Sequence, residues 1–325
     1  MKYKKGYNMQ SDDLKLNIIT DEQYLNKMLN LNVNIPVWID PIAIKCYKQK
    51  EIIEITLNDE PLTYYVLPYY IKDSSKWVER KYRYFAYLSP FFIRKVPNKK
   101  EKEAIYLIFK YIFEKYDYMY MPLHPSFTSI SSIQGLGAFI ETRHTHVLTN
   151  TLNLNNLDSR LRNNIKSAAK KLEITIDYDF KKFNFDIAIH GDEDEKKCRM
   201  ENALNLLKNK KAIIFTGYYE GKPIIGNMVT FDNEWVYGLH AWQIDKVPRG
   251  SGPYIIYSIS KWAFEENNMK YFDFEGSVMQ SIDNYFCNFN CEQIIYPYVH
   301  YGKNRKKMLE LIDTSHDIEG RLFKK

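Results

Sequence analysis

The run from Trp235 to Phe274 constrains the fold of this chain more than any other stretch. A strand pattern from Trp235 to Ile244 is followed by Gly250-Ser251-Gly252-Pro253, where a helix begins. That helix runs to about Asn267, and a second strand pattern begins at Tyr271. Two strand patterns that flank a helix so closely favour a fold in which helices cover a sheet.

Helical and strand patterns also mix in the rest of the chain. Apolar residues recur at helical spacing from Asn98 to Tyr116 and from Leu157 to Leu172. Each half contains a strand–turn–strand pattern with a turn proline, Pro61 or Pro223, and an Ile pair precedes each proline at nearly the same spacing. We therefore expect an α/β (α+β) fold of two similar domains, each a mixed twisted sheet flanked by helices.

The length of 325 residues supports two domains, since an average domain has ~100–200 residues. We predict a flexible N-terminal tail over residues 1–13, an N-terminal domain over residues 14–150 and a C-terminal domain over residues 151–325.

Composition excludes several classes of protein. With 45% hydrophobic and 26% charged residues, the chain is not disordered, collagenous or coiled-coil. Its most apolar stretch, Tyr84 to Ile93, is shorter than the ~18–20 residues of a membrane-spanning helix. The N-terminus has no apolar segment typical of a signal peptide. We therefore expect a cytoplasmic protein without a transmembrane segment.

Cysteine content and net charge limit the ligands. Four cysteines in a chain of this size do not form a disulfide framework, and Cys287 and Cys291 have no histidine at zinc-site spacing. We expect no metal. The net charge of +6 fits a partner that carries phosphates, such as a nucleotide cofactor or RNA, but does not require one.

The glycine loop is a candidate anion site. Gly250 and Gly252 let the backbone approach a phosphate, and the N–H groups at the start of a helix point toward such a group. Lys246 and Arg249 place cationic side chains beside the loop. Two interpretations remain open here: a pyrophosphate site that includes Ser251, or a turn that only needs its glycines.

Two carboxylates and a histidine are candidate bases. Asp273 and Glu275 lie in the strand pattern that begins at Tyr271 and therefore share one face, where burial together with mutual repulsion raises the pKa of one of them. A raised pKa suits a general base, whereas the alternative is a structural ion pair with Arg or Lys. His240 is another candidate base, or a structural residue. Strand alternation places it on one face with Val236 and Trp242.

The helix from Leu157 to Leu172 carries a basic face. Arg162, Lys166 and Lys170 repeat at a spacing of four residues, opposite the apolar stripe. Because like charges at this spacing repel, they form either a solvated surface or a groove for an anionic acceptor or cofactor.

Three places in the chain carry a resemblance to GNAT acyltransferases, in particular to the Fem-like branch that includes the peptidoglycan aminoacyltransferases. The helix run Leu161-Arg162-Asn163-Asn164-Ile165-Lys166-Ser167-Ala168-Ala169-Lys170 is similar to the Arg-Asn-Ile-x-x-Ala-x-Lys run of that branch. The second place is the strand, glycine loop and helix from Trp235 to Asn267. The third runs from Phe272 through Ser277 and on through Ile282 to Asn290, where such proteins have an aromatic pair and then Phe-Gly.

The resemblance covers roughly Leu154 to Tyr298 and implies two tandem GNAT-like domains. It implies transfer of an acyl group from acetyl-CoA, or another acyl-CoA, to an amine acceptor such as an amino sugar, a peptide or a cell-envelope precursor. The strand from Trp235 to Ile244 would pair with the pantetheine arm of that donor, and the amides of Arg249 to Gly252 would hold its pyrophosphate.

The resemblance also implies catalytic roles. Asp273, Glu275 or His240, in that order, would take a proton from the acceptor amine, and Tyr285 would protonate the leaving thiolate. The acceptor would lie in a cleft between the halves and face Arg162 and Lys166.

The sequence departs from the family pattern at three positions. Val247 stands where GNAT enzymes usually have Arg or Gln, Phe286 where they often have a general-acid Tyr, and Asn290 where a glycine is expected. The short span from Phe180 to Lys211 leaves little room for the helical hairpin that tRNA-dependent Fem enzymes often carry. An aminoacyl-tRNA donor and a non-catalytic binding module are the alternatives to the acyl-CoA enzyme.

Overall fold

The computed structural model describes residues 13–31, 33–79, 85–189, 193–275 and 280–310. All of the predicted tail except Asp13 lies outside these residues, as do Gly276 and Ser277 of the third resemblance segment. Among the described residues, no helix has the length and apolar character needed to cross a bilayer.

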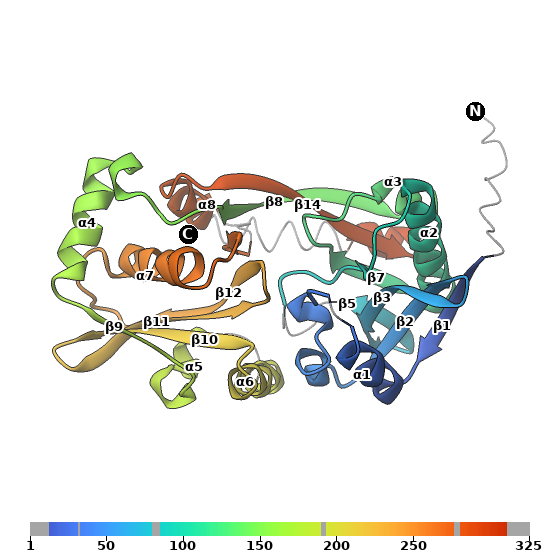
Figure 1. The fold of residues 1–325 in the computed structure, drawn as a ribbon, viewed down its shortest axis with the longest axis horizontal. Coiled ribbons are helices and arrows are strands. Elements are labelled where there is room, and N and C mark those ends of the chain that lie inside the picture. The colour runs from blue at the N-terminus through green and yellow to red at the C-terminus, as the bar shows by residue number, and fades with distance from the viewer. Residues whose placement is uncertain (1–12, 32, 80–84, 190–192, 276–279, 311–325) are drawn as a thin grey trace.

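A four-stranded sheet belongs to the N-terminal half. Its order is β1-β2-β3-β6, and all pairs are antiparallel. The bounds of these strands are β1 (Leu14–Ile19), β2 (Lys50–Leu57), β3 (Glu60–Pro68) and β6 (Phe91–Phe92). Helix α2 (Asn98–Lys115) packs on β1 and β2 and matches the helix predicted from Asn98 to Tyr116. Helix α1 (Asp21–Leu29) and the short 3-10 helices at Val37–Ile39 and Ala43–Cys46 lie in the same half (Figure 1).

A ten-stranded sheet runs through both halves, in the order β4-β5-β7-β14-β8-β13-β12-β11-β10-β9. Its strands are β4 (Tyr70–Lys72), β5 (Ser75–Glu79), β7 (Tyr118–Pro122), β8 (Phe139–Leu148), β9 (Glu173–Asp177), β10 (Ala212–Tyr219), β11 (Lys222–Phe231), β12 (Trp235–Gln243), β13 (Tyr271–Asp273) and β14 (Glu292–Gly302). The C-terminal strand β14 lies between β7 and β8, which come from the N-terminal half. The two halves therefore share one continuous sheet.

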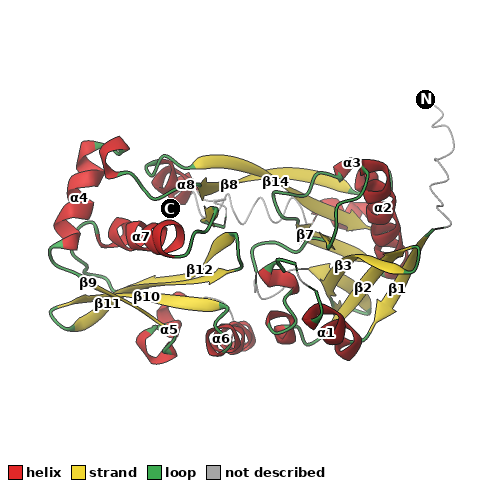
Figure 2. Ribbon diagram, viewed as in Figure 1, coloured by secondary structure: helices red, strands yellow, loops and turns green. Residues whose placement is uncertain are grey.

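Helices cover both faces of the strands in the C-terminal half (Figures 1 and 2). In these views α4 (Ser159–Ala169) and α7 (Ser251–Lys261) lie on one side of β9 to β12, and α5 (Phe185–Ala188) and α6 (Glu193–Lys208) lie on the other. A π-helical turn, Trp262–Glu266, extends α7. The remaining helices of the described residues are α3 (Ile130–Gln134), α8 (Gln280–Cys287) and two 3-10 helices at Leu154–Asn156 and Phe180–Lys182.

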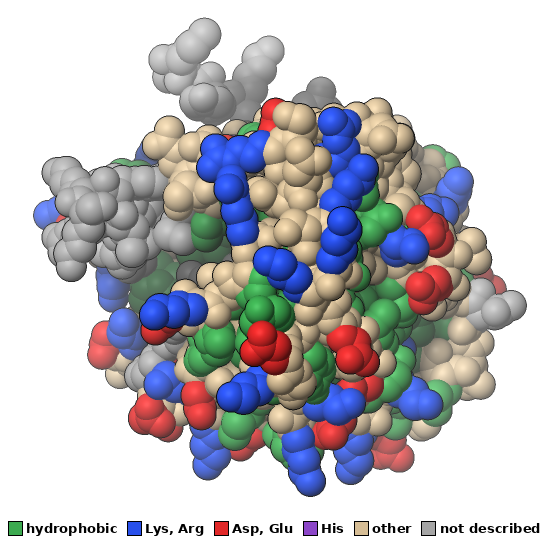
Figure 3. Space-filling view, turned by 90° about the vertical axis from the view of Figure 1, so that its left-hand side faces the viewer, with side chains coloured by type: hydrophobic (Ala, Val, Ile, Leu, Met, Phe, Trp, Pro, Cys, Tyr) green, Lys and Arg blue, Asp and Glu red, His purple; other side chains and the backbone are tan. Residues whose placement is uncertain are grey.

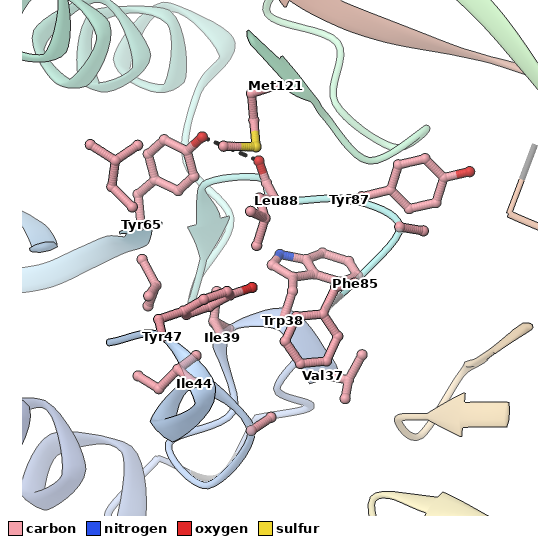
Figure 4. Packing of buried hydrophobic residues seen from close by; sticks show 14 of the residues in the cluster. Val37, Trp38, Ile39, Ile44, Tyr47, Tyr65, Phe85, Tyr87, Leu88 and Met121 are labelled. Atoms are coloured by element: carbon pink, nitrogen blue, oxygen red, sulfur yellow. Dashed lines mark hydrogen bonds between the residues drawn. The ribbon is translucent and has the colours of Figure 1, made fainter. Parts of the chain in front are cut away.

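Two clusters of buried side chains form the core. The smaller one fills the space between α4, α7 and the sheet, with Ile165, Phe215 and Ile255 among its members. The larger one extends from the N-terminal half across the junction and under α6. Figure 4 shows part of it, where the hydroxyl of Tyr65 donates a hydrogen bond of 3.2 Å to the carbonyl oxygen of Leu88. The predicted mixed fold of twisted sheets flanked by helices is confirmed.

Candidate active site

The parallel strands β12 and β13 pair over only three residues. Residues 235–237 of β12 pair with residues 271–273, where β13 ends, while β12 continues to Gln243. Beyond this pairing β12 is bonded to β11 on one side and, among the described residues, has no strand on the other. Divergence at the carboxyl ends of parallel strands opens a crevice of the kind in which α/β proteins bind ligands.

A β-bulge bends β12 at the start of this crevice. Met228 pairs with His240 and Val229 with Gly238, so Leu239 is an extra residue. The extra residue reverses the alternation of side chains: Val236 belongs to the core cluster under α7, and Trp242 belongs to the cluster on the α6 side. The prediction that Val236 and Trp242 share one face was therefore wrong.

A cavity of about 780 Å³ occupies the crevice. This size is within the range of ~300–1,000 Å³ typical of small-molecule sites. Most of the side chains around it are apolar, and six elements supply them. They are Ile187 of α5, Ile225, Gly226, Asn227 and Val229 of β11, residues 238–243 of β12, Gly252, Ile255 and Ile256 of α7, Phe272, Phe274 and Glu275 at the end of β13, and Ile282, Tyr285 and Phe286 of α8.

Asp273 is fully buried but does not line this cavity. Its carboxylate accepts hydrogen bonds from the hydroxyl of Tyr87 at 2.9 Å, the hydroxyl of Thr145 at 2.5 Å and the amide of Glu275 at 2.6 Å. Burial raises the pKa of Asp273 to about 6, although these hydrogen bonds act in the opposite direction. The predicted rise in pKa thus has burial as its main cause, and the partners are hydroxyls and an amide rather than the Arg or Lys of the ion-pair alternative.

Glu275 lines the cavity and is half-buried. It lies beyond the end of β13 and has a left-handed backbone with φ of 64°. Strand alternation therefore does not apply to it, and it does not share a strand face with Asp273 as expected.

His240 and Tyr285 also line the cavity. Burial, together with the nearby guanidinium of Arg199, lowers the pKa of His240 to about 3, so its imidazole is neutral at physiological pH. Burial raises the pKa of Tyr285 above its ordinary value, so its hydroxyl keeps its proton and can donate it. A Cβ atom at Gly252 would lie 3.1 Å from this hydroxyl. The glycine thus leaves the tyrosine hydroxyl accessible at the start of α7.

The glycine loop has a packing role that the sequence did not reveal. Gly250 has φ of 91°, and a Cβ there would be 2.2 Å from the carbonyl oxygen of Asn164 on α4. Ser251 is buried, and both its amide and its hydroxyl donate to the carbonyl oxygen of Pro248, at 3.1 and 2.5 Å. Since the first N–H groups of a helix have no intrahelical acceptor, the amides of Gly250 and Gly252 are the donors that an anion at this end of α7 would meet.

Basic side chains surround the same end of α7. Lys246 and Arg249 are exposed on the loop. Arg162 is half-buried and Lys166 is exposed on α4, and Asn164, which contacts Gly250, lies between them in sequence. Figure 3 faces the end of the molecule where α4 lies and shows Lys and Arg side chains gathered on its upper part. The structure thus brings the glycine loop and the basic helix together.

The space between the two halves is separate from the candidate active-site cavity. A cavity of about 760 Å³ lies there, with Trp38 and His124 from the N-terminal half and Trp235 among its lining residues. Neither Arg162 nor Lys166 lines it, because α4 packs on α7 at the far end of the C-terminal half (Figure 1). The expectation that these two side chains face a cleft between the halves was wrong.

Sequence reasoning missed the partners of Asp273. Tyr87 lies 186 positions before Asp273 in the sequence, and Thr145 of β8 lies 128 positions before it. No local pattern in the sequence marks either residue as a neighbour of Asp273.

Comparisons with known proteins agree on the fold. No protein-family model matches the sequence, and a search of curated protein sequences finds no significant match. Among solved structures, FemX superimposes with a TM-score of 0.62 at 12% identity, over 92% of this chain and 99% of that one. The C-terminal domain of a putative lysylphosphatidylglycerol synthetase from Agrobacterium fabrum gives a TM-score of 0.58 at 9% identity, over 91% and 97%.

A third similar structure is a tandem GNAT protein from the clavulanic acid biosynthesis pathway, with a TM-score of 0.51 at 6% identity, over 89% of this chain and 98% of that one. Sequence identities this low show similarity of the fold alone. In this chain, the bulged β12 and the short pairing of β12 with β13 are the features that form the candidate site. The fold of this chain is similar to the folds of FemX and of the tandem GNAT protein.

Proposed function

We propose that the protein is an N-acyltransferase that moves an acyl group from a CoA thioester to an amine acceptor. The observation that carries this proposal is the edge of β12 beside the cavity at the start of α7, which pairs with no strand among the described residues. Its main-chain N–H and C=O groups can pair with an extended amide chain as a further strand would. The pantetheine arm of acyl-CoA is such a chain.

The basic end of the crevice fits the phosphates of the same donor. The amides of Gly250 and Gly252 would meet the pyrophosphate, with Lys246 and Arg249 beside it. The basic face of α4 adjoins this loop through the contact between Asn164 and Gly250. We therefore assign Arg162 and Lys166 to the donor side of the site instead of the acceptor side.

The reaction needs a base and an acid at the thioester. The acceptor nitrogen attacks the thioester carbon, the C–S bond breaks, and the amine proton goes to a base. Glu275 is the first choice and His240 the second, since both line the cavity, whereas Asp273 does not. Tyr285 would protonate the leaving thiolate, and a β12 amide would stabilise the oxyanion.

Thermal unfolding tests the donor. Millimolar acetyl-CoA or CoA, but not ATP, should raise the melting temperature by a few degrees, because a ligand at 100 times its Kd adds about 2.7 kcal/mol of stability. Gly252→Val should lose the shift, because its side chain would meet the hydroxyl of Tyr285. Gly135→Ala is the matched control, since a Cβ there makes only ordinary contacts away from the cavity. No shift with any CoA compound would contradict the acyl-CoA donor.

An aminoacyl-tRNA donor is the second candidate. The gathering of Lys and Arg at the α4 end of the molecule favours it, because RNA phosphates would bind there (Figure 3). An aminoacyl-tRNA donor predicts tRNA binding that weakens steeply as the salt concentration rises. If neither CoA compounds nor tRNA bind, the remaining alternative is a non-catalytic binding module.

The acceptor belongs to the amine class in all catalytic versions of the proposal. Candidates are an amino sugar, a peptide and a cell-envelope precursor. A panel of these amines, assayed for release of free CoA thiol from acetyl-CoA, would identify the class.

A further inference from the structure

Three potential metal ligands converge between β8 and α8. His144 and His146 are two residues apart on β8 and therefore point to the same face of the sheet. The Nε2 atoms of His144 and His146 lie 2.9 and 2.7 Å from Oδ1 of Asp283 on α8. The three ligand atoms lie within 4.8 Å of one another. We propose that these residues form a binding site for a divalent transition-metal ion of the zinc type.

The donor set defines the class of ion. Two imidazole nitrogens and one carboxylate oxygen suit Zn²⁺, Co²⁺ and Ni²⁺ better than Mg²⁺ or Ca²⁺, which prefer all-oxygen ligands. A tetrahedral ion with bonds of ~2.0–2.1 Å would separate its ligand atoms by roughly 3.3 Å. The two nitrogen–oxygen distances are 2.9 and 2.7 Å, so they need to open by roughly half an ångström.

The cluster is accessible to solvent on one side. The side chain of His144 is 42% exposed and that of Asp283 is 25% exposed, whereas His146 is buried. An ion can therefore enter from the side of His144 and Asp283. With three protein ligands, a fourth position remains for water.

The environment of His146 limits the expected affinity. A histidine that binds metal through Nε2 carries its proton on Nδ1, and that N–H usually donates to an acceptor. The Nδ1 atom of His146 is buried and has no hydrogen-bond partner among the described residues. Since loss of such a partner typically weakens metal binding by about 10–100-fold, we expect a weaker site than a structural zinc centre.

A metal ion here would tie α8 to the sheet. Helix α8 also carries Tyr285 and Phe286, which line the candidate active-site cavity. The ring of Phe286 lies 5.8 Å from that of His146 and 4.6 Å from that of Phe274. Metal binding should therefore hold this wall of the cavity in place. The site itself depends only on His144, His146 and Asp283, so it does not rest on the proposed function.

Metal binding to the full chain tests the site. Zn²⁺ titrated into chelator-treated protein should bind saturably at one ion per chain and raise the melting temperature, and Co²⁺ should give the visible absorption of a tetrahedral complex. His144→Ala and Asp283→Asn should each weaken Zn²⁺ binding by about tenfold or more. Asp283→Asn keeps the side-chain shape, and circular dichroism would verify that both variants fold.

Two matched variants should keep the binding. Cys287→Ser removes an exposed thiol one helical turn after Asp283. His300→Gln removes a histidine of β14 that is paired with Glu141. Absence of saturable Zn²⁺ binding in the parent protein would overturn the proposal. So would binding that survives Asp283→Asn but is lost in Cys287→Ser, because a cysteine site would then explain it.

Discussion

The hydroxyl of Tyr87 donates a hydrogen bond of 2.9 Å to the carboxylate of Asp273, across the junction of the two halves. Thr145 of β8 donates to the same carboxylate, so three segments distant in the sequence meet at one buried group. Asp273 therefore links the two halves through hydrogen bonds, whereas the residues to which we assign the proposed chemistry line the cavity.

Asp273 makes the stability of the protein depend on pH. Its pKa is about 6 in the folded protein against an ordinary value of 3.8, so the folded state binds the proton more tightly than the unfolded state. The stabilisation is complete below pH 3.8 and is lost as the pH rises through 6. The rise of this pKa from 3.8 to about 6 corresponds to roughly 3 kcal/mol of stability.

Urea unfolding of the parent protein and of Asp273→Asn at pH 4 and pH 7 would measure this effect. The free energy of unfolding of the parent, measured relative to that of the variant, should be lower at pH 7 than at pH 4. Asparagine does not titrate, so the variant lacks this change. Equal differences at both pH values would show that Asp273 has an ordinary pKa in the folded protein.

Gly250→Ala should destabilise the protein by at least about 2 kcal/mol, through backbone strain at positive φ and through overlap with α4. Gly221→Ala is the matched control, because Gly221 has φ of 75° but no atom within 4 Å of its Cβ position. Gly221→Ala should lower the free energy of unfolding only through backbone strain. Chemical denaturation measures both, and equal losses would argue against close packing of Gly250 on Asn164.

Tyr285→Phe tests the proposed acid. The ring and its packing remain while the hydroxyl is lost, so kcat for acyl transfer should fall by about 10²–10⁴-fold with little change in the Kd of the donor. Tyr271→Phe is the control, since Tyr271 stacks on Trp235 and does not line the cavity. An unchanged kcat in Tyr285→Phe would remove this residue from the mechanism.

Charge reversal on α4 tests the donor side of the site. The double variant Arg162→Glu with Lys166→Glu should raise the Kd of CoA by about tenfold or more, since each lost attraction to a phosphate is worth about 1 kcal/mol near the surface. Lys222→Glu, an exposed residue at the start of β11, should leave the Kd unchanged. Calorimetric titration at two salt concentrations would measure the change. A Kd that does not respond would place the phosphates elsewhere.

Local sequence patterns predicted most of the elements around the site. The helix from Asn98 and the helix within Leu157 to Leu172 follow from apolar spacing, which depends only on neighbouring residues. The strand, glycine loop and helix from Trp235 onward follow from the same local signals. Roles in binding and catalysis for the residues of this region stay predictions.

The sequence by itself determined where many of the helices and strands form and where the loop at Gly250 lies, because periodicity and backbone preferences are local. Only the tertiary structure decided which strands pair, that β14 lies between β7 and β8, and that Leu239 is an extra residue in β12. It alone placed Asp283 beside His144 and His146, and Tyr87 beside Asp273. These contacts join residues more than 130 positions apart, and the burial that stabilises them has no signature in the neighbouring sequence.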